Sequence, residues 1–157
     1  KTPSDNRTDY IKRLIGLPND TIQFISGDMY INDKKIYKSK VKNSLYVNCG
    51  GLTFEANSYI ETLPNGKKYT AVYSSLNSME NTDKFLVPTN HYFFLGDNRD
   101  CSKDSRFLNS VGYVNFNNLV GKARIIFFSN DVKKGNFFKF WRWHKSLRFN
   151  RFFKIIK

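Results

Sequence analysis

Several features that would assign a protein class are missing from this sequence. It has only two cysteines, Cys49 and Cys101, and no C-x-x-C or Cys/His cluster, so neither a zinc site nor another cofactor site is expected. No apolar run reaches the roughly 18 residues that a transmembrane helix needs, and no signal peptide is visible. The two cysteines are read by default as buried or free thiols, and one long-range disulfide is also permitted.

What is present indicates a folded, mostly β protein. The 157 residues suit one domain or a core with a modest insertion, and 40% apolar with 17% aromatic residues is too much for a disordered chain. Phe and Tyr are abundant and Ala is scarce, a mixture that favours strands. The first residue is Lys rather than Met, so we expect that an upstream part has been removed or left out.

The net charge of +13 is concentrated at one end and points to an anionic partner. From Phe137 to Lys157 there are seven Lys or Arg and no acid, and the cations recur at every third residue. On a helix this period winds the cations around all sides, so no two-faced amphipathic helix is predicted. A short helix with Trp141 and Trp143 near lipid headgroups and a partly disordered basic tail both remain open.

Apolar and turn patterns divide the chain into a core, an insertion and this tail. Alternating segments and turn residues predict a β core from residues 1–32 and 84–132, a small irregular β insertion at 33–83, and a basic aromatic tail at 133–157. Tyr10–Leu17 is an apolar segment with two adjacent cations, and the expected core strands include Thr21–Ile25 and Met29–Asn32.

Lys12 lies inside the apolar segment YIKRLIGLPND. On a strand it would share one face with Tyr10 and Leu14, while Arg13 and Ile15 would point the other way. The local pattern alone favours a lysine that extends to solvent from an edge strand. The functional alternative is a lysine in a dry pocket with a lowered pKa.

A second charged stretch, GDNRDCSKDSR, follows an apolar run at residues 92–95. Its acids and arginines cannot be buried unless they pair, and paired Asp–Arg bridges make stiff supports. Gly96 and Gly112 bracket the segment and permit sharp turns. Taken alone, the stretch fits a solvated loop better than a site.

Together the two stretches resemble the bacterial type I signal peptidases, membrane-anchored serine proteases with a Ser/Lys dyad. Residues 10–20 match the family pattern Y-I-K-R-x-x-G-L-P-G-D, except that Asn19 replaces Gly. Residues 96–106 match G-D-N-R-D-x-S-x-D-S-R at every fixed position, and the Gly-x-Val and Gly-Lys-Ala pieces follow at 112–114 and 121–123. The resemblance covers neither the insertion nor the tail, and it implies a signal-peptidase-like β-sheet catalytic core.

The resemblance also implies roles for individual residues. Lys12 falls on the general base, and Ser102 on the hydroxyl that hydrogen-bonds and orients it. The supporting ion pairs fall on Arg13 with Asp97 and on Asp104 with Arg106. A free lysine has a pKa of about 10.4, so a base working near neutral pH must be desolvated; the charges of nearby arginines and aspartates are expected to offset one another. No histidine is needed, so His91 and His144 are expected to be bystanders.

One part of the family pattern is not found. The nucleophilic serine stands before the lysine in a Ser-Met-x-Pro-Thr motif, whereas only Ser4 precedes Lys12, in a Pro-Ser-Asp context; Ser78-Met79 is treated as coincidence. We therefore expect the C-terminal portion of a signal peptidase, with the nucleophile and a membrane anchor supplied by an upstream part, and no proteolysis by this chain alone.

The predicted function is thus removal of N-terminal signal peptides from exported preproteins. The implied location is the bacterial inner membrane, with the catalytic domain on the periplasmic or extracytoplasmic side, and the expected partners are preprotein signal peptides and an anionic membrane surface. Two alternatives stay open: an inactive peptidase fragment, and a basic aromatic β module that binds nucleic acid. The latter is less favoured because no stacking motif is present.

Overall fold

A computed structural model describes residues 1–74, 79–130 and 146–156. The aromatic and basic residues at 137–145, including Trp141, Trp143 and His144, lie outside this range, so the alternatives predicted for them stay predictions. The chain forms two compact units, Lys1–Val120 and Gly121–Lys157. The boundary expected between residues 132 and 133 also stays a prediction.

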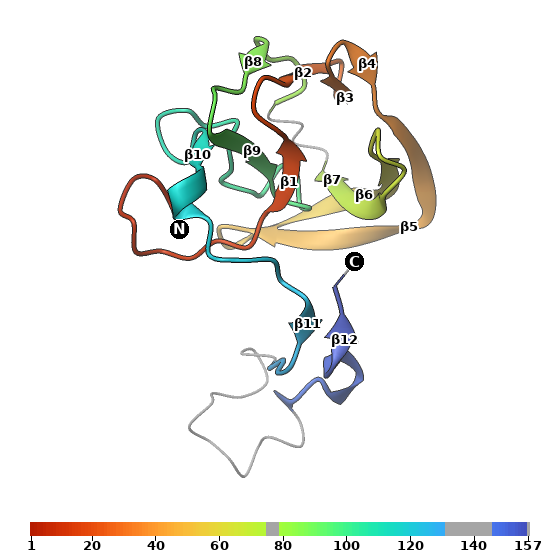
Figure 1. The fold of residues 1–157 in the computed structure, drawn as a ribbon. Coiled ribbons are helices and arrows are strands. Elements are labelled where there is room, and N and C mark those ends of the chain that lie inside the picture. The colour runs from red at the N-terminus through yellow and green to blue at the C-terminus, as the bar shows by residue number, and fades with distance from the viewer. Residues whose placement is uncertain (75–78, 131–145, 157) are drawn as a thin grey trace. The chain divides into compact units, whose positions relative to one another are not determined.

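The described residues are mostly β, which confirms the predicted fold class (Figure 1). In chain order the elements are β1 (Arg13–Gly16), β2 (Thr21–Ile25), β3 (Asp28–Ile31), β4 (Lys34–Lys35), β5 (Tyr37–Cys49), β6 (Leu52–Thr62), β7 (Lys68–Ser74), β8 (Phe85–Leu86), β9 (His91–Leu95), β10 (Val114–Asn115), the 3₁₀ helix η1 (Phe116–Asn118), β11 (Ile125–Ile126), the 3₁₀ helix η3 (Phe149–Arg151) and β12 (Lys154–Ile155).

The first unit is built on two small antiparallel sheets, ordered β1-β9-β10 and β4-β3-β2-β8. The predicted hairpin of Thr21–Ile25 with the following strand is confirmed, and its alternating side chains Ile22, Phe24 and Met29 are almost fully buried. Phe93 and Leu95 of β9 belong to the same hydrophobic core. The core therefore includes side chains of β9, the strand that leads directly into residues 96–106.

Only part of the apolar segment Tyr10–Leu17 forms a strand. Strand β1 begins at Arg13, so Lys12 precedes the strand instead of lying within it. The expected alternation also fails, because the pairing with β9 shifts register between Leu14 and Gly16, and both Ile15 and Gly16 are buried. A register irregularity of this kind cannot be seen in one strand alone.

The insertion is more regular than its polar composition suggested. Strands β5, β6 and β7 form a three-stranded antiparallel sheet, in which β5 has 13 residues and β6 has 11 (Figure 1). The predicted turn at Asn65-Gly66 joins β6 to β7. Tyr46 and Leu52 of these strands are exposed whereas Ser58 and Glu61 are buried, so the strands lack the apolar alternation by which strands are recognised.

The second unit pairs two short strands from distant parts of the chain. Ile125 lies opposite Ile155 and Ile126 opposite Lys154, and the rings of Phe128 and Phe149 both contact Phe152. Among the residues that the structure describes, no helix is long and apolar enough to cross a membrane.

Candidate active site

Lys12 and Ser102 meet although they are 90 residues apart in the chain. The Lys12 Nζ atom donates a hydrogen bond to Ser102 Oγ at 2.7 Å. Strand pairing explains this meeting: β1 follows Lys12 directly, and Arg13 lies opposite Leu95, the last residue of β9. The loop that carries Ser102 begins immediately after Leu95, so the antiparallel pair brings both side chains to one end of the sheet.

Gly96 packs closely against Ser102 and lies near Lys12. A Cβ atom at Gly96 would lie 1.9 Å from Ser102 Oγ and 3.5 Å from Lys12 Nζ. The sequence suggested that Gly96 permits a turn, but the structural reason for a glycine is close packing against Ser102. The same contact leaves Ser102 only 9% exposed.

The environment of Lys12 favours the neutral amine. Desolvation by burial is the largest effect and lowers the pKa of Lys12; attraction to Asp104 works against this, and repulsion from Arg106 adds to it. Desolvation dominates, as expected. The two charges that act on the pKa of Lys12 in opposite directions are those of Asp104 and Arg106. The Tyr10 ring covers another side of the amine, with its centroid 5.2 Å from Nζ.

Arg13 and Asp97 form the first predicted ion pair. The guanidinium donates through Nε at 2.7 Å and Nη2 at 2.9 Å, the bidentate geometry that suits a carboxylate. The hydrogen bond to Asp97 raises the pKa of Arg13. Arg13 also stacks over the Tyr69 ring at 4.1 Å, so the first turn of the loop is held against the insertion sheet.

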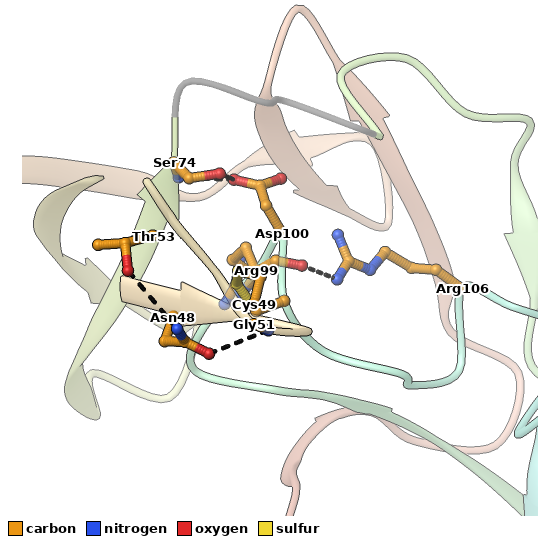
Figure 2. Close-up of a disulfide and its surroundings, with 9 residues drawn as sticks. Asn48, Cys49, Gly51, Thr53, Ser74, Arg99, Asp100 and Arg106 are labelled. Carbon is orange, nitrogen blue, oxygen red and sulfur yellow. Dashed lines mark hydrogen bonds between the residues drawn. A yellow bond between two sulfur atoms is a disulfide. The ribbon is translucent and has the colours of Figure 1, made fainter. Parts of the chain in front are cut away.

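Asp104 and Arg106 form the second predicted pair, and it is buried. Arg106 donates to the Asp104 carboxylate through Nε and Nη2, both at 2.9 Å. Asp104 also accepts the Gly96 N–H at 3.0 Å, and Arg106 donates to the main-chain carbonyl of Arg99 (Figure 2). All six sequence-predicted site residues are therefore brought into one region.

A third ion pair, between Arg99 and Glu61 of β6, was missed by sequence reasoning. The Arg99 guanidinium donates to Glu61 through Nη2 at 2.6 Å and Nη1 at 3.0 Å, and both side chains are 1% exposed. The hydroxyls of Tyr69 and Tyr73 donate to the Glu61 carboxylate and accept from Arg99. No local signal marked Glu61, because the exposed Glu55 alternates in the same phase on β6.

The insertion is also joined to the loop by a disulfide, Cys49–Cys101, with 5.4 Å between the two Cα atoms (Figure 2). The default reading of two thiols was therefore wrong, because the β5–β6 hairpin carries Cys49 to the residue before Ser102. Asp100, the residue before Cys101, accepts a hydrogen bond from the Ser74 N–H at 2.7 Å (Figure 2). Residues 99, 100 and 101 are thus each tied to the insertion sheet.

The remaining candidates are placed less centrally. His91 opens β9, at the opposite end of the strand from Gly96, and its ring nitrogen contacts the Thr89 carbonyl at 2.9 Å. Ser78 lies outside the described residues. The chemistry at the centre is that of an amine: a neutral lysine within hydrogen-bond reach of a hydroxyl can accept a proton.

Comparisons with known proteins identify the family of this chain. Residues 1–128 match the family model described as signal peptidase, peptidase S26. The chain is 42% identical over 171 aligned positions to signal peptidase I of Rickettsia conorii, covering 99% of this chain and 62% of the relative. It is 41% identical to signal peptidase I of Rickettsia bellii, covering 57% of that protein. The chain thus spans about three fifths of the length of these curated relatives.

A solved structure is also similar, the signal peptidase I from Enterococcus faecalis V583. Its sequence is 28% identical, the match covers 76% of this chain and 87% of that one, and the TM-score is 0.41.

Proposed function

Because the chain belongs to the signal peptidase family, peptidase S26, we propose that it forms part of an endopeptidase that removes N-terminal signal peptides from exported preproteins. The observation that carries the proposal is the hydrogen bond of 2.7 Å between Lys12 Nζ and Ser102 Oγ, at a lysine whose pKa is lowered by burial. A Ser/Lys dyad needs such a lysine, because only the neutral amine can take the proton of a serine hydroxyl.

Lys12 is the general base of this proposal. In acylation the nucleophilic hydroxyl attacks the scissile carbonyl carbon, its proton passes to Lys12 Nζ, and the ammonium then returns that proton to the leaving amine. In deacylation water attacks the ester, and Lys12 takes and returns a proton in the same way. The lowered pKa of Lys12 makes the neutral form more accessible in each cycle.

Ser102 is assigned to orient the base, and it is not assigned to attack the substrate. Its hydroxyl is packed beneath Gly96 and is almost inaccessible, which leaves no approach for a peptide carbonyl. Accepting the hydrogen bond from Lys12 restricts the rotation of a long flexible side chain. The ion pair of Arg13 with Asp97 supports the chain next to Lys12, and the ion pair of Asp104 with Arg106 supports the chain next to Ser102.

The nucleophile is assigned to a segment outside these 157 residues. No serine of this chain stands in a Ser-Met-x-Pro-Thr motif. We place the complete enzyme at the bacterial inner membrane with this domain on the extracytoplasmic side. The net charge of +13 supports attraction to the anionic membrane surface where preproteins emerge.

The test is a cleavage assay on a synthetic preprotein signal peptide. The 157-residue chain is compared with the same chain joined at its amino end to the segment of a family member that carries the Ser-Met-x-Pro-Thr motif. We expect the joined protein to cleave after small residues and the chain alone not to cleave. Lys12→Ala in the joined protein should lower kcat by about 10²–10⁴-fold, the usual contribution of a positioned acid–base group.

Lys34→Ala is the matched control, because Lys34 is an exposed lysine of β4 in the same unit. Equal activity of the Lys12→Ala protein would reject Lys12 as the base. Cleavage by the 157-residue chain that disappears in Lys12→Ala would instead place the nucleophile within this chain.

A further inference from the structure

We propose that Glu61 of the insertion sheet is a positioning residue for the Lys12–Ser102 pair. Its carboxylate holds Arg99, and Arg99 in turn fixes the loop and the buried ion pair that surround Lys12. The inference rests on the proposed function, since it matters for activity only if Lys12 is the base. It assigns a role in the reaction to the insertion, a region that the family motifs do not cover.

The first step is that Glu61 and Arg99 form a buried ion pair with several hydrogen bonds. Both oxygens of the carboxylate accept from the guanidinium, and the hydroxyls of Tyr69 and Tyr73 bridge the same two side chains. Neither charge reaches solvent, so each needs the other to remain buried. The position of Arg99 is therefore determined by β6 and β7, and not by its own loop.

The second step is that Arg99 carries the main chain of the loop with it. The Arg99 N–H donates to the Val72 carbonyl at 2.8 Å, and the Val72 N–H donates to the Asp97 carbonyl at 2.7 Å. These bonds form a parallel bridge between Val72 of β7 and Asn98. The loop is thus docked on the insertion sheet three residues before Ser102.

The third step leads from Arg99 to Lys12. The Arg99 carbonyl accepts a hydrogen bond from the Arg106 guanidinium (Figure 2). Arg106 in turn pairs with Asp104. Asp104 and Arg106 are the two charges that act on the pKa of Lys12. A displacement of Arg99 therefore alters the field at the Lys12 amine through a chain of contacts that never passes through solvent.

The direction of the effect follows from the groups that face Lys12, which are Tyr10, Ser102, Asp104 and Arg106. If Arg106 loses its main-chain acceptor, its hold on Asp104 weakens and the attraction of Asp104 for an ammonium at Lys12 increases. Loosening of the loop also admits water to the amine. Both changes raise the pKa of Lys12. A purely structural role for Glu61 predicts lower stability with the pKa of Lys12 unchanged in the folded protein.

The experiment is an NMR titration of Lys12 in the 157-residue chain. The side-chain 13Cε and 15Nζ signals, assigned by their loss in Lys12→Ala, report the pKa without any need for the nucleophile. In Glu61→Gln we expect this pKa to rise toward the ordinary value of a lysine. Glu55→Gln is the matched control, because Glu55 lies on the same strand with its side chain exposed and loses the same charge.

Tyr73→Phe is the second variant and removes only one hydroxyl from the network while keeping the ion pair. It should raise the pKa of Lys12 by less than Glu61→Gln, and it decides the question if Glu61→Gln does not fold. A lowered pKa in the parent chain that stays unchanged in these variants would overturn the role of Glu61 alone. An ordinary pKa of Lys12 in the parent chain would instead overturn the proposed function and, with it, this inference.

Discussion

Lys12 and Arg99 are two cations of the same site, and the structure treats them in opposite ways. The Arg99 guanidinium donates to the Glu61 carboxylate at 2.6 Å and also donates to the hydroxyls of Tyr69 and Tyr73. Lys12 is hydrogen-bonded to the neutral hydroxyl of Ser102. Burial is the largest single effect on Arg99 and disfavours its charge, but Glu61, Tyr73 and Tyr69 together outweigh it and raise the pKa of Arg99. At Lys12 burial dominates and lowers the pKa.

The comparison teaches that burial by itself does not decide the state of a cation. A carboxylate in direct contact raises the pKa of a buried cation and keeps it charged. A neutral hydroxyl in the same place does not offset the effect of burial, so the cation loses its proton more readily. The site needs both outcomes within a few residues: a rigid loop on one side and an amine that can exchange its proton on the other.

The largest expected effect tests the structural half of this comparison. Arg99→Ala leaves the Glu61 charge buried without its partner, so we expect the free energy of unfolding to fall by about 3–5 kcal/mol. Arg13→Ala is the matched control, because its partner Asp97 is 47% exposed and the loss should stay below about 1 kcal/mol. Urea unfolding followed by circular dichroism measures both. Similar losses in the two variants would contradict the distinction between the buried and the exposed pair.

Removal of the disulfide tests the same distinction, because it breaks a covalent link without changing a charge. Replacing both Cys49 and Cys101 with Ser opens a link across 52 residues, and we expect a loss of about 2–4 kcal/mol. Because the Glu61–Arg99 pair stays in place, the Lys12 pKa should change less than in Glu61→Gln. Urea unfolding gives the first quantity and the NMR titration of Lys12 the second. A stability equal to that of the parent chain would show that the tie contributes nothing.

The smallest expected effect concerns the proton on Lys12. In the folded chain its pKa lies below the 10.5 of an ordinary lysine, so between these two values the unfolded chain holds a proton that the folded chain has lost. Stability contributed by Lys12 therefore rises with pH across that interval. Compared with Lys12→Met, in which other groups titrate equally, the parent chain should gain up to about 1 kcal/mol between pH 7 and pH 10.5, after allowance for solvent screening of a half-buried amine.

Urea unfolding of both proteins at a series of pH values measures this difference. A difference that is constant would mean that Lys12 keeps an ordinary pKa, and one that falls with pH would mean that its pKa is raised in the folded chain. Either result would remove the contrast with Arg99.

Much of the site could be predicted from two short stretches of sequence. Their resemblance to a family placed Lys12, Ser102 and both flanking ion pairs correctly in one region. Glu61 was not found, because the exposed Glu55 stands on the same strand with the same alternating local pattern. Its burial depends on a partner 38 residues away. The disulfide stayed open for the same reason, since distance in space between two cysteines is not a property of their neighbours.

The sequence by itself determined the class of fold and the chemistry that is available. Alternating apolar residues specify the β2–β3 hairpin, and a lysine, a serine and paired charges in family order specify the reactive groups. Only the tertiary structure decided which cation is held by a carboxylate and which is left with a hydroxyl. The physical reason is that a pKa depends on the solvent and the charges around a group, and these are supplied by strands that lie far away in the chain.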